Sequence, residues 1–244
     1  MLEIKDLKKR FGAKQVLNGV DLKVPEHSVF GFVGQNGAGK TTTMKMILGL
    51  LASDEGEIYI NGERVTCGSN KTNKYVGYLP DVPEFYDYMT ATEYLDFCGS
   101  VTGMGIAQKK ERIKEMLILV GLEKEEKRIK GFSRGMKQRL GIAQALLNKP
   151  LLLICDEPTS ALDPVGRKEI LEVLSAAKQD TTVLFSTHIL SDIEKICDHI
   201  ALLHDGKILL SGTMEEVKNT HKNSDSQNLE LSLSSISEVQ LAGL

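Results

Sequence analysis

A glycine-rich loop ending in lysine and threonine is the clearest place for chemistry in this sequence. The loop reads Gly34-Gln35-Asn36-Gly37-Ala38-Gly39-Lys40-Thr41 and is followed by Thr42. It fits the pattern GxxxxGK[ST] and lies between an apolar run typical of a strand and a segment with helical spacing. Glycines let backbone N–H groups turn inward around phosphate oxygens, and a helix N-terminus adds its positive end. The loop therefore predicts a nucleoside triphosphate site, with Lys40 on the β- and γ-phosphates and the Thr41 hydroxyl on Mg²⁺.

Two adjacent carboxylates follow a second apolar run, "LLLICDEP". Taken alone, Asp156 and Glu157 are also compatible with a solvated turn. However, ligands of open α/β sheets bind at the carboxyl ends of the strands, where these residues are expected. Beside the glycine loop, we expect Asp156 to hold Mg²⁺ through water and Glu157 to polarise the attacking water.

A histidine follows a third apolar run, "TTVLFST". His188 comes 31 positions after Glu157 (188 − 157) and again falls at the carboxyl edge of the expected sheet. A histidine at a strand end often has only a structural role. The alternative is that it contacts the γ-phosphate and stabilises the transition state.

A second anion-binding pattern occurs in "FSRGMKQRL", at 132–140. One interpretation is a helix cap, because serine is a good N-cap and Ser133 precedes a helical segment. The other is that Ser133 and Gly135 bind a triphosphate other than the one at Lys40. In that case two copies of the chain would pack head to tail, each capping the nucleotide of the other.

Phe11 precedes the glycine loop and is an aromatic residue with two interpretations. It is compatible with a core position, and equally with a ring on which an adenine base stacks.

The surrounding pattern alternates strands and helices, so it predicts an α/β fold with a mixed sheet. Buried strands are expected at 28–33, 75–80, 151–155 and 181–187, and helices at 42–51 and 164–178. Antiparallel structure is expected where Val20, Leu22 and Val24 alternate, and at hairpins turning on Asn61-Gly62 and Asp205-Gly206.

Residues 91 to about 147 carry amphipathic helical patterns with hardly a strand signal. We therefore expect an all-helical insert at about 82–148 inside a domain covering 1–220. The tail at 221–244 is rich in serine and asparagine and contains the alternating run "NLELSLSSI". This pattern fits a strand or a loosely attached end.

Composition excludes several classes of protein. The sequence is 41% hydrophobic and 26% charged, as in a globular protein, and its 30 basic against 33 acidic residues argue against a nucleic-acid partner. The four cysteines have neither zinc-ligand nor CxxC spacing, which favours a reducing compartment. No signal peptide is expected at the first residues, and no apolar run approaches the roughly 20 residues that span a bilayer.

The ordered motifs "GQNGAGKTT", "FSRGMKQR", "LLLICDEPTSALDP" and "STH" resemble those of the ATP-binding cassette (ABC) ATPases, from Met1 to about Asn219. The resemblance implies a P-loop NTPase of ABC type, with a mixed sheet core, an antiparallel β portion and an inserted helical subdomain. It implies that Phe11 stacks on adenine, that Ser133 and Gly135 cap the partner's ATP, and that Asp163 contacts the partner subunit.

Two positions depart from the family pattern. The usual LSGGQ signature reads Phe132-Ser-Arg-Gly-Met136, and Asp81 stands where the family generally has glutamine. That glutamine normally contacts Mg²⁺ or the water and senses the membrane subunit. Asp81 is compatible with the same role as a carboxylate, or with an ordinary turn.

The sequence motifs "YLP…" and "SRGMKQRL" are similar to those of single-cassette subunits of bacterial exporters of the bacitracin and lantibiotic type. The resemblance implies a Mg²⁺-dependent ATPase that acts as a homodimer. It would drive a separate membrane-spanning permease from the cytoplasmic face and export a peptide antibiotic or lipid-like compound. The alternative is a cassette ATPase that assembles a cytosolic complex.

Overall fold

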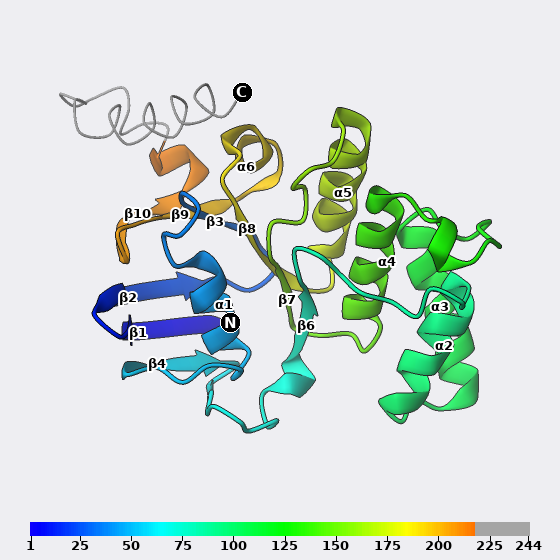
Figure 1. The fold of residues 1–244 in the computed structure, drawn as a ribbon, viewed down its shortest axis with the longest axis horizontal. Helices are drawn as coiled ribbons and strands as arrows, with labels where there is room; N and C mark the ends of the chain where they lie inside the picture. Colours follow the sequence, from blue (N-terminus) through cyan, green and yellow to red (C-terminus); the bar gives the residue numbers. More distant parts are fainter. Residues whose placement is uncertain (218–244) are drawn as a thin grey trace.

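A computed structural model of the chain shows two β-sheets with a group of helices extending from one end (Figure 1). The structure describes residues 1–217. The tail discussed above, at 221–244, lies outside the described residues.

The larger sheet has six strands in the order β10-β9-β3-β8-β7-β6, and only β10 runs antiparallel to its neighbour. The strands are β3 (Val29–Val33), β6 (Val76–Leu79), β7 (Leu152–Cys155), β8 (Thr182–Thr187), β9 (His199–His204) and β10 (Lys207–Thr213). All residues of β3, β7 and β8 are buried, which explains their continuous apolar runs. Because these strands are parallel, their carboxyl ends share one edge of the sheet.

The smaller sheet is antiparallel, in the order β2-β1-β4-β5. Its strands are β1 (Leu2–Phe11), β2 (Lys14–Val24), β4 (Glu55–Ile60) and β5 (Glu63–Arg64). The predicted turn at Asn61-Gly62 is present, with positive φ at both residues. Strand β1 was not predicted, because a register shift between Ile4 and Leu7 breaks its alternation of apolar residues.

The helices are α1 (Lys40–Ile47), α2 (Ala91–Val101), α3 (Ile106–Leu119), α4 (Arg134–Leu146), α5 (Pro164–Ala177) and α6 (Leu190–Ile196), with short 3₁₀ turns at Asn73–Tyr75 and Ile129–Gly131. Helix α1 lies between the two sheets (Figure 1) and buries Met44 and Ile47 in a core shared with Phe30 and Ile58. It ends before the predicted residue 51, and Gly49 follows with a φ of 68°.

The predicted helical insert is confirmed: α2, α3 and α4 pack together at one end of the molecule (Figure 1). Helix α2 begins with a capping box, in which Thr90 accepts from the Glu93 N–H and Glu93 accepts from the Thr90 N–H. Leu95, Ile113 and Leu140 belong to one buried cluster. Within the insert, the described residues add only a single bridge between Thr90 and Arg128 to this helical structure.

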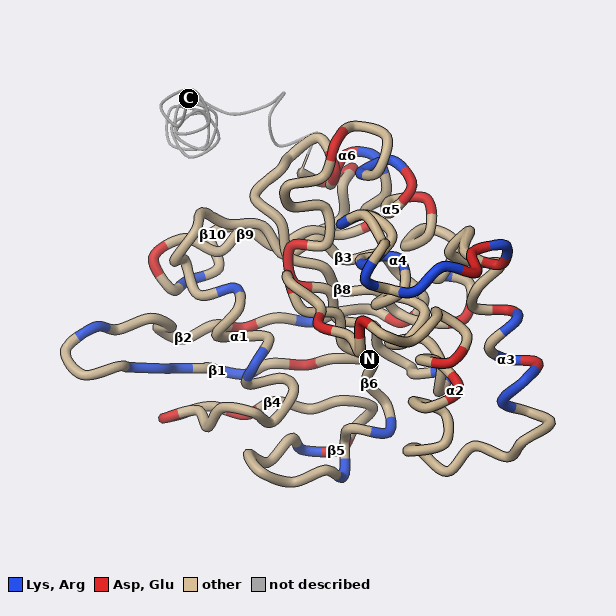
Figure 2. The backbone as a smooth tube through the Cα atoms, turned by 45° about the vertical axis from the view of Figure 1, so that its right-hand side comes forward, with Lys and Arg blue, Asp and Glu red and all other residues tan. Residues whose placement is uncertain are grey.

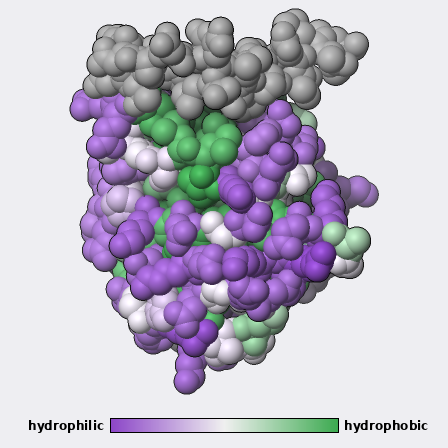
Figure 3. Space-filling view, turned by 90° about the vertical axis from the view of Figure 1, so that its left-hand side faces the viewer, coloured by the Kyte–Doolittle hydropathy of each residue, from purple (hydrophilic) through white to green (hydrophobic). Residues whose placement is uncertain are grey.

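Basic and acidic residues are interspersed along the backbone (Figure 2), and the face seen in Figure 3 is mainly hydrophilic, with one apolar area in its upper part. The longest helices, α3 and α5, have 14 residues each. Within residues 1–217, no helix combines the length and apolar character needed to cross a membrane.

Candidate active site

The glycine loop connects β3 to α1, as predicted, and its glycines are needed for two different reasons. A Cβ on Gly34 would lie 2.6 Å from the Leu203 carbonyl oxygen, so the site tolerates no side chain. Gly39 has a φ of 112°, and a Cβ there would lie 2.7 Å from Leu17. Gly37 has a φ of 84° with open space around it, so only its backbone conformation calls for glycine.

Lys40 begins α1 with a side chain that is 5% exposed. Its ammonium donates to the Gly34 carbonyl at 2.6 Å and to the Gln35 carbonyl at 3.2 Å. It also lies 3.1 Å from Glu157 Oε1. Since Gly39 has no side chain, it offers no side-chain acceptor to the first N–H groups of α1.

A buried serine holds the acidic pair at the end of β7. Ser186 Oγ donates to Asp156 Oδ1 at 2.6 Å and accepts from the Glu157 N–H at 2.9 Å. Sequence reasoning missed Ser186. Its signal was a hydroxyl that directly follows the apolar run 183–185 of the fully buried strand β8, where a buried polar group needs partners.

Glu157 contacts Lys40 and His188 and has a left-handed backbone, with a φ of 47°. Its Oε2 lies 2.9 Å from His188 Nδ1. Burial alone would raise the pKa of Glu157, but the hydrogen bond from His188 and the charge of Lys40 outweigh it and the pKa is lowered. The same hydrogen bond raises the pKa of His188 above its usual 6.5, despite the opposing effects of burial and Lys40.

Asp81, two residues beyond β6, is held by one face of α4. Its backbone carbonyl accepts a hydrogen bond of 2.6 Å from Gln138 Nε2, and its Oδ1 lies 3.6 Å from an Arg134 nitrogen. At 3.6 Å the contact is an ion pair and not a hydrogen bond. Burial raises the pKa of Asp81, and Asp156 and Glu157 add to the rise while Arg134 opposes it.

These groups meet at a cavity of about 370 Å³, which lies at the carboxyl edge of the large sheet. It is lined by Asn36, Gly37, Gly39, Lys40, Thr41, Thr42, Asp81, Asp156 and Glu157. The structure thus brings most of the residues predicted for phosphate and metal together on one surface. His188 reaches this group through Glu157.

Besides His188, four predicted residues outside the glycine loop do not line the cavity. Ser133 caps α4, because its hydroxyl accepts from the Met136 N–H at 3.2 Å. The helix cap is therefore present, and binding of Ser133 to a partner's triphosphate stays a prediction. Asp163 caps α5 in the same way, through the Gly166 N–H at 2.9 Å. Gly135 lies beside the loop of Asp163, since a Cβ there would be 3.9 Å from Leu162. Phe11 is 49% exposed, so the core interpretation of Phe11 is wrong.

The cavity suits a magnesium-bound triphosphate by its charges and by its free donors and acceptors. Glu157 Oε1 is a buried acceptor without a hydrogen-bond partner, although it is close to Lys40. The described residues contain no cluster of three or more histidine, cysteine or acidic side chains able to hold a metal. Thr41 and Asp156 both line the cavity. A hydroxyl and a carboxylate fit Mg²⁺, which takes one or two carboxylates from a protein and completes its shell with phosphates and water.

A family model described as ABC transporter matches residues 17–160, which is more than half of the chain. The chain belongs to the ABC transporter family. Membership makes it an ATP-binding and ATP-hydrolysing cassette, and the mixed sheet with inserted helices is the fold of this ABC cassette.

Three relatives illustrate the range of similar ABC proteins. An uncharacterised ABC transporter ATP-binding protein, YxlF of Bacillus subtilis, is 45% identical over 89% of this chain and 72% of its own length. The bacitracin transport ATP-binding protein BcrA of Bacillus licheniformis is 41% identical over 91% of this chain and 72% of its own. The lantibiotic transport ATP-binding protein SrtF of Streptococcus pyogenes is 38% identical over 86% and 90%.

Solved structures agree on the fold. The ATP-binding subunit of an ABC transporter superposes with a TM-score of 0.81 and 33% identity over 99% of both chains. An ATP-binding cassette solved as a dimer in a post-hydrolysis state with ADP and Pi has a TM-score of 0.77 and 25% identity, covering 88% of this chain and 99% of its own.

Proposed function

We propose that this chain hydrolyses ATP at the cavity beside Lys40 and thereby drives a separate membrane-spanning protein. The observation that carries the proposal is the joint placement of Lys40, Asp156 and Glu157 around one cavity at the glycine loop. A cation, a metal-binding carboxylate and a second carboxylate at the phosphate position are the parts that phosphoryl transfer needs.

Lys40 and Glu157 have different roles: Lys40 binds the phosphates, and Glu157 orients the attacking water. Lys40 now pairs with Glu157, so a triphosphate entering the loop competes for the ammonium and frees the carboxylate. Glu157 Oε1 then accepts a hydrogen bond from water and orients it toward the γ-phosphorus. His188 remains beside Oε2, where it would stabilise the negative charge that develops in the transition state.

Thr41 and Asp156 would hold Mg²⁺, which would neutralise part of the negative charge of the triphosphate when bound. The hydroxyl of Ser186 donates to Asp156 Oδ1 and thereby holds this carboxylate in place. Asp81 lies on the same cavity, so its carboxylate is also within reach of this group of ligands.

A second copy of the chain would complete the nucleotide site. Ser133, Gly135 and Asp163 stand at two neighbouring helix N-termini outside the cavity of their own chain. Capping leaves the Ser133 hydroxyl hydrogen free to donate, and helix N-termini attract anions. A head-to-tail dimer would bring these groups to the partner's triphosphate, while the exposed ring of Phe11 stacks on adenine.

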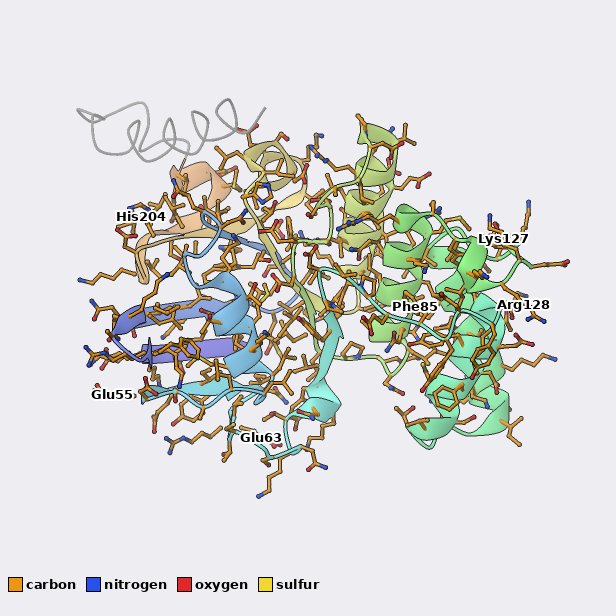
Figure 4. The ribbon with its side chains drawn as sticks, in the orientation of Figure 1. Glu55, Glu63, Phe85, Lys127, Arg128 and His204 are labelled. Carbon is orange, nitrogen blue, oxygen red and sulfur yellow. The ribbon has the colours of Figure 1, made fainter. Side chains whose placement is uncertain are left out.

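The membrane partner would dock on an aromatic groove between α2 and the segment before it. The groove has a volume of about 480 Å³ and is lined by Glu84, Phe85, Tyr86, Tyr94, Phe97, Cys98, Val101, Thr102 and Gln144. Tyr86 contacts Tyr94 and Phe97 edge to face yet stays 47% exposed. Figure 4 shows Phe85 on the helical side of the molecule, away from Glu55 and His204 on the strands.

This groove fits a short cytoplasmic helix of a permease, because an aromatic surface binds the apolar face of such a helix. The names of BcrA and SrtF concern bacitracin and lantibiotic transport. By this similarity the cargo is a peptide antibiotic or lipid-like compound leaving the cell, and the ATPase works at the cytoplasmic face of the membrane.

The deciding experiment is Glu157→Gln. We expect nucleotide binding to persist, ATP turnover to fall by more than about a hundredfold because the water loses its orienting carboxylate, and Mg-ATP to trap a dimer. Turnover near that of the unchanged chain would refute the role of Glu157. Glu172→Gln, on an exposed position of α5, is the matched control and should change none of these properties.

Detergent extraction of the tagged chain separates the two classes of function. Co-purification of a multi-spanning membrane protein is expected for a transporter subunit. Co-purification of cytosolic proteins alone would favour the alternative, an ATPase that assembles a cytosolic complex.

A further inference from the structure

The ion pair between Asp81 and Arg134 joins two parts of the chain that the proposed function uses separately. Asp81 lines the phosphate cavity, whereas Arg134 is the first residue of α4, between Ser133 and Gly135. Each residue belongs to one of the two departures from the family pattern. Asp81 stands in place of the usual glutamine, and Arg134 lies within the altered signature at 132–136. In this structure the two departures face each other at 3.6 Å.

The geometry of α4 makes this contact specific. Arg134 and Gln138 are four positions apart, so they lie on the same face of the helix. Gln138 is fully buried and donates to the Asp81 carbonyl, which keeps the Asp81 backbone against α4. Asp81 Oδ1 is shielded from solvent and has no hydrogen-bond partner, so the charge of Arg134 is its compensation.

From this arrangement we infer that Asp81 restrains Arg134 within its own chain, and that Arg134, once released, binds the triphosphate held by the partner subunit. The inference rests on the proposed shared site, in which Ser133 and Gly135 flank the partner's phosphates. A guanidinium between them would lie at the same phosphates, and phosphate oxygens bind guanidinium more strongly than a single carboxylate oxygen at 3.6 Å does. Arg134 is thus a phosphate-binding residue of the closed dimer, and Asp81 is a positioning residue that sets how readily the dimer closes.

The test measures association of the chain in a Glu157→Gln background by analytical ultracentrifugation across Mg-ATP concentrations. Asp81→Asn removes the restraint and should tighten association about two- to fivefold, the range of exposed ion pairs. Arg134→Ala should weaken association by a similar factor. In the Arg134→Ala background, Asp81→Asn should have no further effect, while Arg134→Lys, which keeps the charge, should restore the response.

One result would overturn the inference directly. Asp81 also lies near the chain's own phosphates, so removing its charge can favour ATP without involving Arg134. In that case the gain from Asp81→Asn would persist in full beside Arg134→Ala. Weaker association of Asp81→Asn would also overturn it, because removal of a restraint on Arg134 cannot by itself weaken the closed dimer.

Asp87→Asn is the matched control, since Asp87 pairs with Lys137 on the same helix at 3.2 Å but does not line the cavity. Binding of a fluorescent ATP analogue to the monomer is measured in parallel and should be equal in Arg134→Ala and the parent. If the Glu157→Gln parent itself fails to associate with Mg-ATP, the proposed function fails. If the parent associates but does not respond to these substitutions, only the inference fails.

Discussion

At the scale of single residues, the site depends on a hydroxyl that performs no chemistry itself. Ser186 is completely buried, and its Oγ connects the Asp156 carboxylate to the backbone of Glu157. Glu157 also holds a left-handed conformation that a non-glycine residue adopts only when its surroundings enforce it. The hydroxyl therefore fixes the Asp156 carboxylate and the backbone from which the Glu157 side chain extends toward Lys40.

Ser186→Ala tests this point. The substitution leaves one carboxylate oxygen and one N–H unpaired, so turnover should fall about ten- to hundredfold and unfolding should cost about 1–3 kcal/mol less. Steady-state ATPase assays and urea unfolding measure the two effects. Ser175→Ala, on an exposed position of α5, should change neither. Unaltered turnover of Ser186→Ala would show that the carboxylates are positioned by other contacts.

At the scale of elements, Asp198 connects three pieces of secondary structure. It lies just before β9, accepts from the Val29 N–H of β3 at 2.8 Å, and accepts from Lys178 at the end of α5 at 2.7 Å. Its own carbonyl accepts from the Met214 N–H, just after β10. Burial alone would raise the pKa of Asp198, but the two hydrogen bonds outweigh it and the pKa lies below its usual 3.8.

Asp198→Asn should therefore destabilise the chain at neutral pH by about 1 kcal/mol, a value reduced for the partial exposure of the pair. A lowered folded-state pKa contributes stability above the unfolded-state pKa and loses it as pH falls through the folded-state value. The difference between the two proteins should thus be full at pH 7 and shrink below about pH 3.8. Urea unfolding across this range measures it, with the exposed Asp180→Asn as control. A difference independent of pH would contradict the assignment.

At the scale of the whole molecule, the nucleotide cavity and the aromatic groove lie in different parts. The cavity is at the edge of the large sheet, whereas the groove is on α2 of the helical insert (Figure 1). Helix α4 spans the distance between them, because Gln138 in its first half donates to the Asp81 carbonyl and Gln144 Oε1 near its end accepts from the Tyr94 hydroxyl in the groove. Movement of α4 would therefore change the contacts of Asp81 at the nucleotide cavity and those of Tyr94 in the aromatic groove.

Phe97→Glu places a charge in the groove and should reduce recovery of the membrane partner about tenfold or more, since burying an unpaired charge costs over 1.4 kcal/mol. ATP binding by the isolated chain should stay the same. Ile106→Glu is the control, because Ile106 is 85% exposed at the start of α3 and does not line the groove. Equal recovery of both variants would show that the partner docks elsewhere.

The sequence alone determined the fold class and the phosphate and acidic motifs, because these depend on local patterns. Continuous apolar runs mark buried parallel strands, and the chain order places Lys40, Asp156 and Glu157 at their carboxyl ends. The helical insert was equally visible, since amphipathic spacing is a property of neighbouring residues.

Only the tertiary structure decided contacts between residues far apart in the chain. Ser186 lies 30 positions from Asp156, and Arg134 lies 53 positions from Asp81 (134 − 81). Strand β1 depends on pairing with β2 and β4 despite its broken alternation. Local spacing carries no information on such partners, because the packing of sheet against helix determines which side chains meet.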